Sequence, residues 1–213
     1  MCWPEERWPL IDEALDWVWT ETERAGLPVM LLMNPGQLHL ADRIAARHPG
    51  LKLVMDHLAR HYGKKDDEAF ADLDKLLALA KRPNIAVKAS GMPAYASDDY
   101  PYRRVHSAVR RAWDAFGPRC VFWGTDLTKL QCTYRQAVTM FTEELPWLTA
   151  ADQEWIMGRA LCEWLGCHCL GVKALPGVAI QRVAAAVAVA CPASRLGMKT
   201  MRQLATTIVP ARK

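Results

Sequence analysis

The stretch LKLVMDHLAR, residues 51–60, is a short apolar run that ends on an acidic and an imidazole side chain, Asp56 and His57. Three other runs share its aliphatic and β-branched character: LPVMLLM (27–33), NIAVKAS (84–90) and RCVFWGT (119–125). Runs of this length and composition are typical of buried strands. The sequence therefore predicts four strands at similar intervals.

Helical patterns separate these strands. Residues 8–26, WPLIDEALDWVWTETERAG, have apolar side chains at helical spacing and end at a glycine, and residues 66–83, DDEAFADLDKLLALAKRP, have acids before bases and a terminal proline. A third helix is expected from about Tyr102 to Phe116. Two more should begin at the capping pairs Thr133 with Gln136 and Thr149 with Asp152. Strands separated by helices need crossover connections, so the fold class is α/β with a parallel sheet.

Parallel sheets place their ligands at the carboxyl ends of the strands. His57 follows the second predicted strand, and Asp126, in FWGTDLT, follows the fourth. Together they could hold a divalent metal, or act as base and acid without one. A simpler reading remains open, in which the histidine satisfies a backbone carbonyl and the aspartate caps a helix.

Composition points to an ordinary globular chain, because 51% of the 213 residues are hydrophobic and 23% are charged. No apolar run is long enough to span a bilayer and no secretion signal opens the chain, so we expect a cytoplasmic protein. The seven cysteines form no CxxC pair, and the CHC at 167–169 has no second ligand pair. We expect reduced thiols.

Charge divides the chain near residue 166. All 23 acids and 20 of the 27 basic residues lie in 1–166, whereas 167–213 contains seven bases and no acid. We expect residues 167–213 to be a basic Ala/Val-rich extension that is poorly ordered and adds little to the fold. Its charges are dispersed, which argues against an arm for nucleic acid or membrane.

Three ordered motifs carry a family resemblance: LKLVMDHLAR, RPNIAVKASGM and FGPRCVFWGTDLT. They resemble the second half of the amidohydrolase-related (amidohydrolase 2) family, which includes pyrone-dicarboxylate hydrolase and sugar-lactonase types. There an aliphatic strand ends in Asp-His, the next carries Lys with Ser-Gly, and the next ends in Trp-Gly-Ser/Thr-Asp. The resemblance implies a (β/α) TIM-like barrel. A complete barrel needs about 250 residues, so residues 1–166 should form its C-terminal half, with about four βα units.

The chain also departs from the family pattern. It contains no His-x-His, and Leu32 stands where many relatives have a histidine, with Asn34 as the nearest polar group. The resemblance implies a divalent metal such as zinc at His57 and Asp126, but two ligands are too few for a catalytic zinc site. Some family members work without metal, so the cofactor stays open.

The resemblance implies a hydrolase of a lactone, ester or related carboxylated small molecule. Asp126 would be the general base, and His57 would polarise the carbonyl or hold the metal. The loop 90–104 would cover the same edge. Expected substrate-binding residues are Arg60, Tyr95, Tyr102 and Arg103, although residues 98–104 could simply begin a helix with solvated charges.

Two residues of the third strand are open to several roles. Lys88 lies in an apolar setting and should pair with a carboxylate or extend to the rim. Ser90 lacks a nucleophile elbow, so no nucleophilic role is assigned to it.

The alternative function is a non-catalytic or truncated half-barrel that associates with a partner through an exposed sheet edge. We expect a small-molecule substrate as the partner and no nucleic acid or membrane, and a homo-oligomer is compatible with the open edge. We predict that the parent protein is a hydrolase. We also predict that this chain alone is inactive and prone to association.

Overall fold

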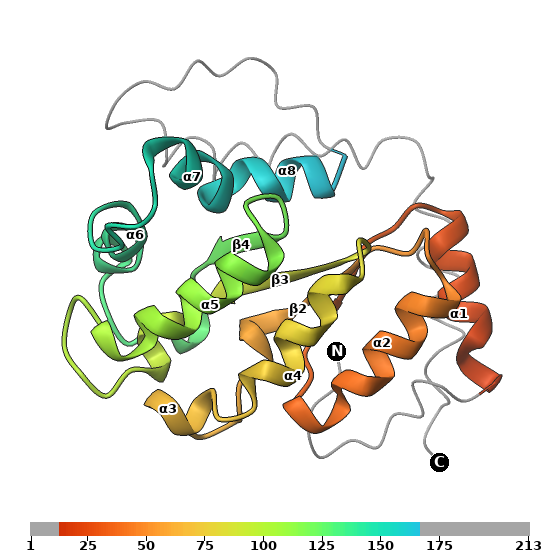
Figure 1. Cartoon of the computed structure of the whole chain (residues 1–213), viewed down its shortest axis with the longest axis horizontal. Coiled ribbons are helices and arrows are strands. Elements are labelled where there is room, and N and C mark those ends of the chain that lie inside the picture. The colour runs from red at the N-terminus through yellow and green to blue at the C-terminus, as the bar shows by residue number, and fades with distance from the viewer. Residues whose placement is uncertain (1–12, 167–213) are drawn as a thin grey trace, which may run out of the picture. The chain divides into compact units, whose positions relative to one another are not determined.

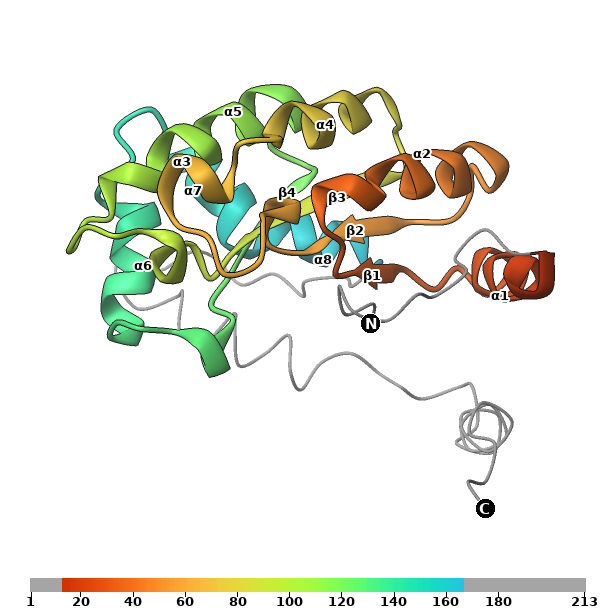
Figure 2. The same ribbon diagram turned by 90° about the horizontal axis from the view of Figure 1, so that it is seen from below.

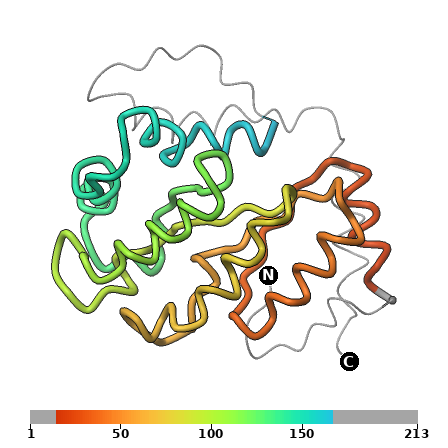
Figure 3. The backbone as a smooth tube through the Cα atoms, in the orientation of Figure 1, coloured from red at the N-terminus to blue at the C-terminus, as the bar shows by residue number. Residues whose placement is uncertain are grey.

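A computed structural model describes residues 13–166. The predicted extension at 167–213 and the CHC motif lie outside these residues, as do Leu10 and Ile11 of the first predicted helix. All four predicted strands are present and parallel: β1 (Val29–Leu31), β2 (Leu53–Met55), β3 (Ile85–Ser90) and β4 (Val121–Gly124). They lie side by side in chain order, β1-β2-β3-β4, which confirms the α/β class with a parallel sheet (Figures 1 and 3).

The helices that connect the strands cover one face of the sheet. The bounds of the helices are α1 (Glu13–Arg24), α2 (Leu38–Arg47), α3 (Asp66–Ala69), α4 (Leu73–Leu77), α5 (His106–Phe116), α6 (Tyr134–Thr142), α7 (Ala150–Glu154) and α8 (Ala160–Trp164). Figure 2 shows α2, α4 and α5 together on one side of the sheet. Among residues 13–166, no helix combines the length and the apolar character needed to cross a membrane.

Successive strand residues face opposite sides of the sheet, as the period of two requires. Met55 and Val87 point into the large apolar cluster beneath the helices. Val54, Ala86 and Phe122 face the other side, where they pack with Ala160. Each side chain has almost no exposed surface, and burying one as large as Met55, Val87 or Phe122 stabilises the fold by about 1.5–3 kcal/mol. The core thus holds the sheet from both faces and fixes the strand ends.

Helix α2 was not specified by the sequence analysis, although its signals are present. Asn34 accepts a hydrogen bond from the Gly36 N–H, and Gln37 accepts one from the Asn34 N–H, so the turn before the helix is capped. Ala41 and Ile44 then bury one face of the helix.

The prediction of one continuous helix over 66–83 is wrong. The first helix ends at Ala69, a second begins at Leu73, and the segment ends in a 3-10 turn, Ala78–Lys81. Phe70 leaves helical geometry and is buried. Asp72 accepts from His61 at 3.0 Å, which fixes the turn. Tertiary packing here overrides helical propensity.

The later helices follow the prediction more closely. The expected third helix is α5, preceded by the 3-10 turn Arg103–Val105, and the capping boxes at Thr133 and Thr149 are both confirmed.

Candidate active site

The candidate site lies at the carboxyl ends of β2, β3 and β4. After β2 the chain enters a tight turn, Asp56–Ala59, with left-handed backbone at His57 (φ 53°), Leu58 (φ 52°) and Ala59 (φ 46°). Each such non-glycine residue costs about 1–3 kcal/mol. The Leu58 side chain, fully buried, anchors the turn against the core. This strained turn orients His57, and strain of this kind clusters at functional sites.

His57 and Asp126 meet across the end of β3. The His57 Nε2 lies 3.6 Å from the Asp126 Oδ2, and both side chains are mostly buried. Asp126 precedes the short turn Leu127–Lys129 but makes no side-chain capping bond to it. Asp126 thus holds the N-cap position of this turn, as the simpler reading has it, but its side chain does not cap the turn and is left for the site. The simpler reading of His57 is partly right, because its Nδ1 contacts the backbone carbonyl of Ser90 at 3.3 Å.

Burial lowers the pKa of His57 below its ordinary value of 6.5, and the nearby Asp126 and Asp56 carboxylates oppose this shift without reversing it. The imidazole is therefore neutral at pH 7. A neutral ring beside a carboxylate can accept or donate one hydrogen bond at the site, as general acid–base chemistry requires.

Lys88 pairs with Asp56, with 2.6 Å between the Nζ and Oδ1 atoms. Both side chains are largely shielded, so the pair supplies the compensating charge that a lysine within an apolar strand needs. Of the two roles left open for Lys88, the carboxylate partner is the one observed.

A pocket of about 290 Å³ opens beside this pair, lined by residues that include Leu32, Asn34, His57, Arg60, Asp126 and Lys129. The Arg60 guanidinium lies 4.4 Å from the Tyr95 ring centre and 5.4 Å from that of Tyr62. Stacking of this kind holds a guanidinium plane while leaving N–H groups for a carboxylate. Two cations and two acids thus surround the pocket.

The other predicted substrate-binding residues lie further from it. Tyr95 is buried beneath Arg60, and burial raises its pKa above the ordinary 10, so the phenol stays neutral. Tyr102 packs against Tyr100, and burial raises its pKa to about 12. Arg103 is exposed in the turn before α5. Neither Tyr102 nor Arg103 lines the pocket, and their binding roles stay predictions.

Sequence reasoning missed several residues at the site. Tyr62, Thr128 and Lys129 line the pocket, and Ser90 contacts His57 through its hydroxyl at 2.9 Å. The signal for Ser90 was its position at the end of a strand, directly before a glycine. It was considered only as a nucleophile.

The residues present do not form a metal site by themselves. Within residues 13–166, no group of three or more histidine, cysteine, aspartate or glutamate side chains is placed to hold an ion. His57 and Asp126 are two donors, while Leu32 contributes an apolar wall. A catalytic zinc needs at least one more protein ligand.

Comparison with known proteins agrees with the motifs. Residues 3–160 match the protein-family model described as Amidohydrolase. An L-fucono-1,5-lactonase of Burkholderia ambifaria is 32% identical over 98 residues, which are 45% of this chain and 32% of that protein.

Solved structures share the fold. An amidohydrolase from Burkholderia multivorans with bound zinc superposes with a TM-score of 0.65 at 23% identity, over 74% of this chain and 58% of that one. A candidate 2-pyrone-4,6-dicarboxylic acid hydrolase from Pseudomonas putida gives 0.57 at 21% identity, over 71% and 56%. The chain therefore spans about a third of the lactonase and less than two thirds of either structure.

Proposed function

This chain belongs to the amidohydrolase family, and from that premise we propose that it carries part of the active site of a hydrolase acting on a lactone, ester or related carboxylated small molecule. The observation that carries the proposal is the approach of His57 Nε2 to Asp126 Oδ2, 3.6 Å apart, at the wall of a pocket. A neutral imidazole and a carboxylate at the ends of two strands can hold one water between them.

The reaction needs one attack and two proton transfers. Asp126 would take a proton from the water while the water oxygen adds to the substrate carbonyl, and as the adduct collapses the protonated Asp126 would return that proton to the ring or ester oxygen, which leaves as an alcohol. His57 would orient the same water or polarise the carbonyl. General-base help of this kind contributes about 10²–10⁴-fold to the rate.

The pocket also favours an acidic substrate. The Arg60 guanidinium lies over the rings of Tyr95 and Tyr62, and Lys129 adds a second positive charge. A stacked guanidinium suits bidentate binding of a carboxylate. The similarity to a lactonase and to a candidate dicarboxylic acid hydrolase supports this substrate class.

We also propose that the four strands are one half of a (β/α) barrel. Support comes from the parallel order of the strands and from the 58% of the Burkholderia multivorans amidohydrolase that the chain covers. The half-barrel would end near residue 166, where the composition changes. Because that relative holds zinc, the alternative is that His57 and Asp126 are two ligands of a divalent metal when further residues complete the set, in which case the pair would hold that metal and not the water directly.

One observation favours a second candidate function, a half-barrel that associates with a partner. Among residues 13–166, β1 and β4 each pair with a single strand, and Met30 of β1 is 38% exposed. Strand edges of this kind can accept another chain.

A substrate panel tests the proposal. Purified chain is assayed for metal content and for hydrolysis of a carboxylated lactone, a neutral sugar lactone and a simple ester, with circular dichroism as the check on folding. Turnover that favours the carboxylated lactone supports the hydrolase and would show that this chain is active by itself, against the expectation of an inactive half-barrel. A folded chain that associates in solution and turns over none of them supports the partner-binding alternative.

A further inference from the structure

The turn formed by Ser90 and Gly91 lies between the two proposed catalytic residues. It ends β3, which pairs with β2 on one side and with β4 on the other. His57 follows β2 and Asp126 follows β4, so both side chains meet over this turn. Ser90 is 4% exposed and does not line the pocket, which leaves its hydroxyl out of reach of a substrate.

Ser90 contacts the His57 ring twice. The His57 Nδ1 lies 2.9 Å from the Ser90 Oγ and 3.3 Å from the Ser90 carbonyl oxygen. A carbonyl oxygen only accepts hydrogen bonds, whereas a hydroxyl can accept or donate. Both contacts are hydrogen bonds only if Nδ1 carries the proton and donates. The geometry therefore selects the Nδ1–H tautomer, whose Nε2 is unprotonated.

If Nε2 is unprotonated, its 3.6 Å approach to Asp126 is not a hydrogen bond. The imidazole lone pair and the carboxylate oxygen are both acceptors, so they do not bond each other. A molecule with two donors satisfies both, and a water that gives one O–H to each has the right chemistry. That water would be held with its oxygen free to attack.

Gly91 provides room for the aspartate. Its φ of +66° is left-handed, and a Cβ atom there would lie 2.9 Å from the Asp126 Cβ. Contacts below 3.0 Å force a shift, so any larger residue would displace Asp126 or the turn itself and change the approach of Asp126 to His57.

We propose that Ser90 and Gly91 are positioning residues for the water-activating pair. Ser90 fixes the Nδ1–H tautomer of His57, so that Nε2 accepts from the attacking water instead of polarising the carbonyl, and Gly91 admits Asp126 to the other side of that water. The catalytic consequence rests on the proposed hydrolase function, but the tautomer does not.

The tautomer is measured directly by NMR of chain labelled with ¹³C and ¹⁵N at histidine, above about pH 8, where the rings are neutral. The chain has six histidines, and the signals absent from His57→Gln identify the ring. Wild type should show Nδ1–H. Ser90→Ala keeps the carbonyl at 3.3 Å but removes the shorter contact at 2.9 Å, so it should shift part of the population to Nε2–H, and Ser90→Thr should restore it. Ser107→Ala, an exposed serine on α5, is the matched control and should change nothing. An Nε2–H wild type, or an unchanged tautomer in Ser90→Ala, overturns the role of Ser90.

Kinetics test the catalytic consequence. Loss of a group that orients a catalytic histidine lowers activity about 10–100-fold. The kcat of Ser90→Ala should therefore fall at least tenfold with KM within about twofold, and Ser90→Thr should recover the kcat of wild type. Gly91→Ala should also lower kcat tenfold or more. Gly26→Ala, at φ +64° with open space around its Cβ position, should keep the rate. Unchanged kcat in Ser90→Ala and Gly91→Ala overturns positioning, whereas a chain without turnover but with the predicted tautomer contradicts only the hydrolase proposal.

Discussion

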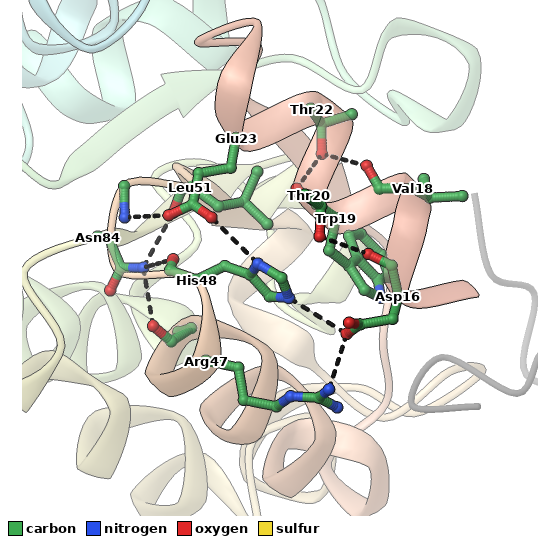
Figure 4. Close-up of polar contacts among 12 residues, drawn as sticks. Asp16, Val18, Trp19, Thr20, Thr22, Glu23, Arg47, His48, Leu51 and Asn84 are labelled. Carbon is green, nitrogen blue, oxygen red and sulfur yellow. Dashed lines mark hydrogen bonds and ion pairs between the residues drawn. The ribbon is translucent and has the colours of Figure 1, made fainter. Parts of the chain in front are cut away.

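Among residues 13–166, the two most deeply buried histidines that contact carboxylates are His48 and His57, and they differ in what their second nitrogen meets. His48, at the end of α2, has Glu23 Oε2 3.1 Å from Nδ1 and Asp16 Oδ1 3.4 Å from Nε2, so α1 supplies a partner to each nitrogen (Figure 4). His57 has Ser90 at Nδ1, but its Nε2 has Asp126 at 3.6 Å and borders a pocket. A histidine whose two ring nitrogens both contact protein side chains stabilises the fold, whereas a histidine with one ring nitrogen at a pocket is available for chemistry.

The surroundings of His48 support its structural role. Arg47 pairs with Asp16 at 2.9 Å, and the Gly50 N–H donates to Glu23 at 2.6 Å. The Asn84 side-chain amide nitrogen lies within 3.1 Å of three backbone carbonyl oxygens, those of Ala45, His48 and Leu51, and shares its two N–H groups among them (Figure 4). These bonds join α1, α2 and the start of β3, far from the reacting groups proposed above.

The largest contrast is expected from replacing each histidine by glutamine. His57→Gln should lower kcat about 100-fold or more, because the ring that orients the water is lost, with little change in the free energy of unfolding. His48→Gln should lower the free energy of unfolding by about 1–2 kcal/mol, because a carboxylate loses its partner, with kcat near wild type. Lactone hydrolysis and urea unfolding of both variants check this, and equal kinetic effects would remove the distinction.

Asn84→Ala sharpens the structural side of the comparison. The amide is 7% exposed, and its removal leaves three carbonyls without that donor. We expect the free energy of unfolding to fall by about 2 kcal/mol, measured by urea unfolding. The catalytic rate of the folded fraction should not change. A loss below about 0.5 kcal/mol would mean that water replaces the amide.

Two arginines extend the comparison to substrate binding. Arg60→Met should weaken the binding of a carboxylated product about tenfold and leave a neutral analogue unaffected, since one charge-assisted contact is lost. Arg47→Met, in the His48 network, should bind both ligands as wild type does. Isothermal titration calorimetry measures all four affinities. A loss for the neutral analogue as large as that for the acid would assign Arg60 to packing.

The smallest expected effect is the pH dependence of stability that comes from Asp42. The Arg82 guanidinium, bonded to Asp42 at 2.8 Å, holds the pKa of that carboxyl below its ordinary 3.8. A lowered folded-state pKa stabilises the fold above pH 3.8, and this stabilisation is lost as pH falls through the folded pKa. Asp42→Asn should therefore melt about 2 °C lower than wild type at pH 6. The difference between the two melting temperatures should shrink as pH falls below 3.8, and a constant difference would assign the effect to packing.

The sequence predicted the parallel sheet because its four apolar runs are short, distinct and separated by amphipathic segments. It predicted His57 and Asp126 because strand ends of a parallel sheet converge. The break near Phe70 was not predictable, since it depends on a tertiary bond from Asp72 to His61. Nor were the Ser90 contacts, which depend on the left-handed turn at His57 and on the register of β2 with β3. Local sequence patterns determine the helices, the strands and the sheet edge at which the site lies. Which side chains contact each other at that edge depends on the turns that follow the strands.

The central claim is that the pair of His57 and Asp126 activates water while the His48 network only stabilises the fold. Hydrolysis of a carboxylated lactone by Asp126→Asn and Asp16→Asn, side by side with wild type and with circular dichroism of each, tests it most directly. We predict a folded Asp126→Asn with kcat lower by about 10²–10⁴-fold, and an Asp16→Asn that keeps its rate but melts at a lower temperature. Turnover that survives in Asp126→Asn, or that is lost equally in both variants, would contradict the account.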